Sequence, residues 1–123
     1  MGGRPLVTIV DDDESVRESL PDLLREFGFD AASFASAEEF LQRGALDHTR
    51  CLLLDIAMPG MSGPALQQEL ARRLQAIPIV FITANCDDNL RRHVLAAGAV
   101  DCLVKPFTEF ALLEALRMAL RSA

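Results

Sequence analysis

Short apolar segments alternate with segments of helical periodicity along this chain, and that alternation restricts the fold more than any other feature. The segments at Cys51–Asp55 and Pro78–Thr83 are apolar at nearly every position. Continuous apolar runs of this length are typical of strands covered on both faces of a parallel sheet. Three further strands are expected at Pro5–Val10, Ala31–Phe34 and Val100–Val104.

Helices are expected between and after these strands. Ser15–Phe27 carries an apolar stripe, with a kink or an adjusted turn at Pro21. Ser36 and Glu39 match a capping box that opens a second helix, which Gly44 ends. The later helices are expected from Pro64 to about Leu74, from Asp87 or Asp88 to Ala97 before Gly98, and from Thr108 or Glu109, the last with Phe110, Leu113, Leu116 and Leu120 on one face. The order βαβαβαβαβα predicts an α/β fold, a doubly wound five-stranded parallel sheet with helices on both faces.

The composition fits one compact domain of a soluble protein. The chain has 123 residues, is 50% hydrophobic, and has no apolar stretch long enough to span a membrane. Met1–Arg4 is a short polar lead-in and not a signal peptide, so we expect a cytoplasmic location. The formal net charge of -6 argues against nucleic-acid binding by this domain, because phosphate contacts need clustered Lys and Arg.

The three cysteines are widely spaced and form no C-x-x-C pair. Together with two distant histidines, they lack the spacing of a zinc site. We interpret Cys51 and Cys102 as small buried hydrophobes in strands, in preference to a redox or metal role. Cys86 follows a strand and is the better candidate for a reactive thiol.

Polar residues follow the strands at their carboxyl ends. Asp11 and Asp12 follow the first strand, Asp55 ends the third, Thr83 ends the fourth and Lys105 follows the fifth. The carboxyl ends of parallel strands share one edge, where open α/β sheets place their ligand sites. We therefore expect these groups to converge.

Crowded carboxylates need a hard dication, and their oxygen atoms suit Mg²⁺ or Mn²⁺. Bound Mg²⁺ can also take phosphate oxygens as ligands. Lys105 would supply a positive charge for a phosphoryl group, and Thr83 a hydroxyl donor. The set predicts a phosphoryl-transfer site with Asp55 as the nucleophile.

Each residue taken alone has a simpler interpretation. Either aspartate after the first strand could cap the first helix, as Asp13 and Glu14 are expected to do. Thr83 could be an ordinary strand residue, and Lys105 a solvated surface charge. Asp55 is the hardest to explain in this way, since a carboxylate after such an apolar run costs free energy unless it has partners. The joint pattern favours the site.

Taken in order, these motifs resemble the receiver domain of response regulators in two-component signalling. The matching segments are Asp11-Asp12, Asp55 with Met58-Pro59-Gly60, Thr83-Ala84 and Lys105-Pro106, and the resemblance covers essentially the whole chain. It implies a (βα)5 flavodoxin-like receiver fold over residues 1–123. The segments after the fourth helix look most like the branch whose full-length members carry a C-terminal helix-turn-helix DNA-binding domain. That output domain would be absent from this chain.

The resemblance also implies how the pocket works. Asp55 would accept a phosphoryl group from a histidine kinase. Mg²⁺ would be ligated directly by Asp12 and Asp55, through water by Asp11, and by the backbone carbonyl of Ala57. Lys105 would pair with the phosphoryl group. The domain would promote its own phosphorylation and dephosphorylation without being an enzyme in the ordinary sense.

Further residues would transmit or time the signal. Thr83 would move to hydrogen-bond the phosphoryl group and draw the following loop inward. Cys102 stands where family members usually place the Tyr or Phe that turns inward, so the signalling lever differs here. The family usually has a cis peptide bond before the proline equivalent to Pro106. Ala57 and Asn85 stand where side chains control water access to the phosphoryl group, and so its lifetime.

Three classes of function remain open. The favoured one is a phosphorylation-controlled switch with a sensor histidine kinase, an output domain or partner protein, and a phosphorylation-dependent homodimer as partners. Transcriptional regulation would be its output, and neither nucleic acid nor membrane would bind this domain itself. A phosphatase, the second class, would need a second carboxylic acid near the nucleophile as general acid, and Ile56-Ala57 supplies none. A stand-alone or atypical receiver acting as a protein-binding module is the third class, which Cys102 keeps open.

Overall fold

A five-stranded parallel sheet forms the centre of the molecule, as the alternating pattern predicts. The computed structural model describes residues 3–121, so Met1 and Gly2 of the polar lead-in lie outside the described residues. The strand order is β2-β1-β3-β4-β5, and every neighbouring pair is parallel. The strands are β1 (Leu6–Val10), β2 (Asp30–Phe34), β3 (Thr49–Asp55), β4 (Ile79–Thr83) and β5 (Asp101–Val104).

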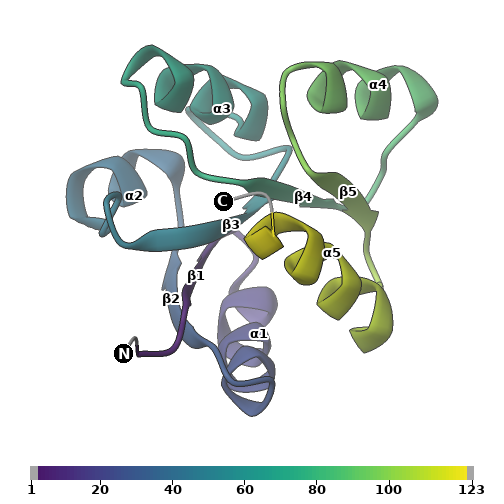
Figure 1. Ribbon diagram of the computed structural model, residues 1–123. Helices are drawn as coiled ribbons and strands as arrows, with labels where there is room; N and C mark the ends of the chain where they lie inside the picture. Colours follow the sequence, from purple (N-terminus) through teal and green to yellow (C-terminus); the bar gives the residue numbers. More distant parts are fainter. Residues whose placement is uncertain (1–2, 122–123) are drawn as a thin grey trace.

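Helices cover both faces of this sheet (Figure 1). They are α1 (Glu14–Glu26), α2 (Ala37–Arg43), α3 (Gly63–Arg72), α4 (Asp88–Ala96) and α5 (Glu109–Arg121). Helices α1 and α5 lie on one face, and α2, α3 and α4 lie on the other. Because successive strand residues point to opposite faces, β5 contributes Leu103 to the core under α1 and α5, and Cys102 to the core under α2, α3 and α4.

Side-chain caps fix the starts of the first two helices. Asp13 caps α1 and Ser36 caps α2, each accepting a hydrogen bond from a backbone N–H of the first turn. The capping box of α2 is displaced by one residue, because Glu39 Oε1 accepts from the N–H of Ala35 at 3.0 Å. Helix α1 continues without interruption through Pro21, which is buried.

Strand β3 begins two residues earlier than the apolar pattern indicates. Thr49 is only 6% exposed, and its hydroxyl oxygen lies 2.9 Å from that of Thr8 in β1. The Thr49 hydroxyl also donates to the carbonyl oxygen of Ala45 at 2.9 Å. Since these polar atoms are hydrogen-bonded, two threonines can occupy buried strand positions that a hydrophobic pattern does not reveal.

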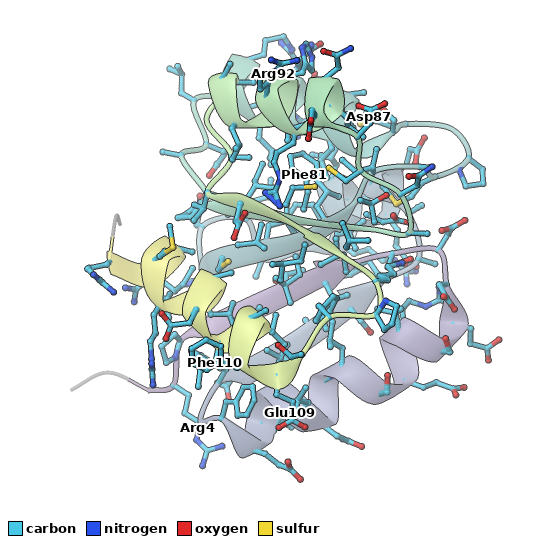
Figure 2. All side chains as sticks on the ribbon, turned by 90° about the vertical axis from the view of Figure 1, so that its right-hand side faces the viewer. Arg4, Phe81, Asp87, Arg92, Glu109 and Phe110 are labelled. Carbon is cyan, nitrogen blue, oxygen red and sulfur yellow. The ribbon has the colours of Figure 1, made fainter. Side chains whose placement is uncertain are left out.

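The predicted stripe of α5 is wrong for Phe110, which is 74% exposed in the first turn of the helix (Figure 2). Of the other predicted positions, Leu116 is fully buried, and Leu113 and Leu120 are partly buried beside the core. The remaining buried residues of α5 are Leu112, Ala115 and Ala119. Small alanine side chains let the helix approach the sheet closely, so the buried stripe is narrower than the large apolar residues suggest. Within residues 3–121, no helix combines the length and apolar character needed to cross a bilayer.

Candidate phosphoryl-transfer site

The predicted acidic residues converge at the carboxyl edge of the sheet. Val10 pairs with Leu54, so Asp11, Asp12 and Asp55 leave two neighbouring strands side by side. One carboxylate oxygen from each aspartate lies within 4.8 Å of the others. This is also the point at which the strand order reverses, because the chain adds β2 on one side of β1 and β3 on the other. Doubly wound sheets bind their ligands at such a point.

Asp11 is fully buried, and hydrogen-bond donors reach both of its side-chain oxygens. Oδ1 accepts from the backbone N–H of Asp13 at 2.9 Å, and Oδ2 accepts from Lys105 Nζ at 2.8 Å. The carbonyl oxygen of Asp11 accepts from Arg17 Nη1 at 2.9 Å. Since Asp13 provides the cap of α1, the helix-capping interpretation fits Asp13 and leaves Asp11 and Asp12 to the pocket.

Asp55 is 6% exposed at the end of β3. Burial, followed by the nearby charge of Asp11, raises the pKa of Asp55 to about 7. A bound cation would relieve this repulsion. Asp12 is exposed, so the carboxylate cluster opens to solvent on its side. Three hard oxygen ligands with an open side fit a dication such as Mg²⁺, which keeps several waters when bound.

Lys105 places a positive charge beside these carboxylates. Its backbone N–H donates to the carbonyl oxygen of Thr83 at 2.8 Å, which ties the end of β5 to the end of β4. Burial acts to lower the pKa of Lys105, but the hydrogen bond and charge of Asp11 outweigh it and raise the pKa above its ordinary value. The ammonium group is therefore charged at neutral pH. The Lys105–Pro106 peptide bond is cis.

The Thr83 hydroxyl is turned into the loop that follows β4. Its Oγ1 donates to the carbonyl oxygen of Asn85 at 3.1 Å and accepts from the N–H of Asn85 at 3.3 Å. Asn85 and Ala57 are both exposed. They follow the two strands whose ends carry Thr83 and Asp55, so their side chains face solvent close to the pocket.

Cys51 and Cys102 are both fully buried in strands, as the sequence predicts. Cys86 is half-buried. Its Sγ lies 3.1 Å from Cys102 Sγ, a contact that the sequence gives no reason to expect because 16 positions separate the two residues. Cys102 therefore packs against the loop that follows Thr83.

Two residues that shape the surroundings of the pocket were missed by sequence reasoning. A Cβ atom at Gly63 would collide with the carbonyl oxygen of Asp55 and with the ring of Phe81, so only glycine lets α3 begin against the end of β3. Glu38 Oε2, from α2, accepts from the N–H of Met61 at 2.9 Å and holds the loop after β3. The segment around Pro59-Gly60 could have pointed to Gly63, whereas Glu38 resembles any other acidic residue in a first helical turn.

A (βα)5 sheet with an acidic pocket at its reversal point defines a receiver-type α/β domain. Residues 7–117 match the family model for the response regulator receiver domain. The chain belongs to this family, the phosphorylation-activated switches of two-component signalling that relay a signal to an output domain. Receiver domains in general bind Mg²⁺ through an acidic pocket and work with histidine kinases, and this chain has the corresponding aspartate cluster.

The relatives of this chain include transcriptional and other response regulators. Nodulation protein W of Bradyrhizobium diazoefficiens is 44% identical over 113 residues, which are 92% of this chain and 50% of that protein. Response regulator protein TmoT of Ectopseudomonas mendocina is 42% identical over 118 residues, which are 96% of this chain and 54% of that protein. The chain thus spans about half the length of these relatives.

Solved structures confirm the predicted receiver fold. The response regulator StyR superposes with a TM-score of 0.89 at 46% identity, over 98% of this chain and 61% of that one. FixJ-N superposes with a TM-score of 0.86 at 36% identity, over 100% of this chain and 98% of that one.

Proposed function

We propose that Asp55 is the phosphoacceptor and takes a phosphoryl group from the phosphohistidine of a sensor histidine kinase. In this step the P–N bond of the phosphohistidine breaks as a P–O bond forms to a carboxylate oxygen of Asp55. The observation that carries the proposal is the convergence of Asp11, Asp12 and Lys105 on Asp55 at one edge of the sheet.

Mg²⁺, or Mn²⁺ in its place, would be held directly by Asp12 and Asp55, through water by Asp11, and by the carbonyl of Ala57. When bound, the ion offsets the charge of the carboxylates and of the phosphoryl oxygens. Asp55 must be ionised to attack, and its raised pKa supports a need for such a cation. Lys105 would bind a phosphoryl oxygen and give up part of its interaction with Asp11.

The phosphoryl group would then reset the loop after β4. Thr83 would exchange its two hydrogen bonds with Asn85 for one to a phosphoryl oxygen, and the loop would follow it inward. Ala57 has no polar side chain with which to orient an attacking water, whereas Asn85 does. These two positions would therefore set how fast the domain loses its phosphoryl group.

We further propose that residues 1–123 are the receiver domain of a longer cytoplasmic transcriptional regulator. The chain spans only about half the length of each of these relatives, which supports this proposal. A second support is that some relatives are transcriptional regulators, such as transcriptional regulatory protein TdiR of Thauera aromatica, which is 38% identical. The output domain would lie outside this chain. Phosphorylation would promote homodimerisation or contact with a partner protein.

Intact-mass measurement tests the phosphoacceptor. The wild-type chain, incubated with Mg²⁺ and phosphoramidate, should gain close to one phosphoryl group and then stop. Asp55→Asn should gain none, while Asp22→Asn, which removes an exposed carboxylate on α1, should behave as wild type. Equal labelling of Asp55→Asn would sink the assignment, and continued turnover of phosphoramidate at a high rate would indicate a phosphatase instead.

A further inference from the structure

The thiols of Cys86 and Cys102 lie together where the loop after β4 contacts the edge strand β5. Cys86 lies in the loop between β4 and α4, and its Sγ is 3.1 Å from Cys102 Sγ in β5. Both cysteines are free. The sulfur atoms of a disulfide are about 2.05 Å apart, so an approach of about 1 Å would bring them to bonding distance.

The two thiols differ in their access to solvent, and this sets the order of any reaction. Cys102 is fully buried, and burial raises its pKa to about 12, with the hydrogen bond to Cys86 adding to the effect. Cys86 is half-buried in a loop, and besides the contact with Cys102 its thiol donates a long hydrogen bond of 3.8 Å to the carbonyl of Asp87. A soluble oxidant therefore reaches Cys86 first. Cys51 is fully buried in β3, and its pKa is also raised to about 12 by burial.

Hydrogen bonds of neighbouring side chains position the two segments that carry Cys86 and Cys102. Arg91, from α4, donates to Asp101 Oδ1 at 3.0 Å and to the carbonyl oxygen of Cys102 at 2.7 Å. Asp87, which follows Cys86 directly, caps α4 by accepting from the N–H of Leu90 at 2.8 Å (Figure 2). Arg91 therefore ties α4 to the strand that carries Cys102, and the Asp87 cap fixes where α4 begins after Cys86.

We propose that Cys86 and Cys102 form a reversible disulfide with a low-molecular-weight disulfide such as oxidised glutathione as the oxidant. The Cys86 thiolate attacks one sulfur of the oxidant, forming a mixed disulfide and releasing one thiol. Cys102, losing its proton, attacks Cys86 Sγ, expels the second thiol and closes the intramolecular bond. Two protein thiols are oxidised and one disulfide is reduced to two thiols, so the electrons balance.

The disulfide would restrain the switch, a consequence that rests on the proposed function. The loop after β4 is bonded to Thr83 at its start, and the new bond would fasten it to β5 three residues later. Asp55, Asp12 and Lys105 are not touched by this bond, so phosphoryl transfer to Asp55 continues. The inward movement of the loop, however, would be opposed, because Cys86 could no longer leave Cys102. Oxidation would thus uncouple phosphorylation from output.

Titration of the folded wild-type chain with graded ratios of oxidised to reduced glutathione tests the bond. We expect the intact mass to fall by two hydrogens, and digestion without reductant to yield a peptide pair joined at Cys86 and Cys102. Cys51→Ala should show the same bond. Cys102→Ser should stop at a glutathione adduct on Cys86. A wild-type chain that only accumulates glutathione adducts, or that pairs Cys51 instead, would overturn the proposal.

Hydrogen exchange of the loop, followed in both redox forms, tests the restraint. In the reduced chain, phosphorylation should change the exchange of the 84–88 amides. In the oxidised chain we expect that change to be at least 3-fold smaller, while the extent of Asp55 phosphorylation stays within 2-fold. An equal change in both forms would overturn the restraint. Absence of phosphorylation even in the reduced chain would instead refute the proposed function, since disulfide formation is measured without any phosphoryl donor.

Discussion

Lys105 Nζ donates a hydrogen bond of 2.8 Å to Asp11 Oδ2, across 94 positions of sequence. The lysine side chain is 20% exposed, and the carboxylate is completely buried. Before any phosphoryl group arrives, the lysine therefore compensates a buried charge and joins the end of β5 to the end of β1. Its proposed second role, at the phosphoryl group, requires a change of partner.

Removing this lysine should destabilise the metal-free domain. Lys105→Met leaves the Asp11 carboxylate buried without its cation, and breaking a buried pair in this way typically costs about 3 kcal/mol. Urea denaturation should show that loss in the free energy of unfolding. Adding Asp11→Asn to Lys105→Met should recover much of it. If the double variant is no more stable than Lys105→Met, the pair does not carry the stability assigned to it.

The pKa of Lys105 can be read directly, because it is the single lysine of the chain. Reductive ¹³C-methylation followed by NMR titration should show its signal titrating above the ordinary lysine range in the metal-free chain, since Asp11 raises the pKa. Asp11→Asn removes the hydrogen bond and the charge that raise this pKa most, while burial still lowers it and the charges of Asp55 and Asp13 still raise it, so the midpoint should fall. An unchanged midpoint would contradict the pairing.

Asp55 should make stability depend on pH in a predictable direction. Its pKa is raised from 3.8 to about 7 in the folded chain, so the folded state holds the proton more tightly than the unfolded state. The associated stability is fully present below the unfolded pKa of 3.8 and is lost as pH rises through about 7.

Metal-free wild type should therefore lose stability relative to Asp55→Asn between about pH 5 and pH 8. Allowing for solvent screening, we expect a relative loss of about 1 kcal/mol, or roughly 4 °C in Tm, by differential scanning calorimetry. The comparison with the variant cancels the other titrating groups. Parallel pH profiles for the two chains would show that burial does not perturb Asp55.

Mg²⁺ should restore the stability that the metal-free wild type loses as Asp55 ionises. A ligand that binds only the folded state stabilises it by mass action, so millimolar Mg²⁺ should raise the Tm while NaCl of matched ionic strength should not. Asp12→Asn should abolish most of the rise. Asp47→Asn, which alters an exposed carboxylate away from the cluster, serves as the control. An Asp12→Asn chain that responds like wild type would remove Asp12 from the metal site.

Thr83 and Cys102 should contribute unequally to the response. In reducing buffer, Cys102→Ala should leave phosphorylation of Asp55 and phosphorylation-dependent partner binding or dimerisation within a few-fold of wild type, because such small buried changes typically cost about 1 kcal/mol. Thr83→Ala removes the hydroxyl proposed to sense the phosphoryl group and should impair the response more. The opposite ranking would make Cys102 a signalling residue in its own right.

The sequence predicts the parallel sheet and the convergence of its polar ends because both depend on local patterns. Apolar runs and caps such as Asp13 and Ser36 define the elements, and parallel pairing then brings Asp11, Asp55 and Lys105 to one edge. Their roles in phosphoryl transfer stay predictions. The geometry adds one correction to the simpler alternatives, since Asp13 caps α1 in place of Asp11 or Asp12.

Features that depend on contacts between distant segments could not be predicted in this way. The pairing of Lys105 with Asp11, and of Cys86 with Cys102, follows from how loops close in space. Phe110 looks like a core residue by spacing alone, but the alanines of α5 turn a different face toward the sheet. Buried hydroxyls such as Thr49 escape a hydrophobic pattern because a hydrogen bond offsets the cost of their burial.

The edge strand β5 limits how copies of this domain can associate. It has only four residues, and Pro106, which follows two positions after it, has no N–H to donate. So short an edge gives an incoming strand little backbone to pair with, and a sheet extending from one molecule to the next is disfavoured. Any dimer formed through this side would rest on side chains of α4 and α5 instead, and the part contributed by exposed charges such as Arg92 would weaken as salt is added.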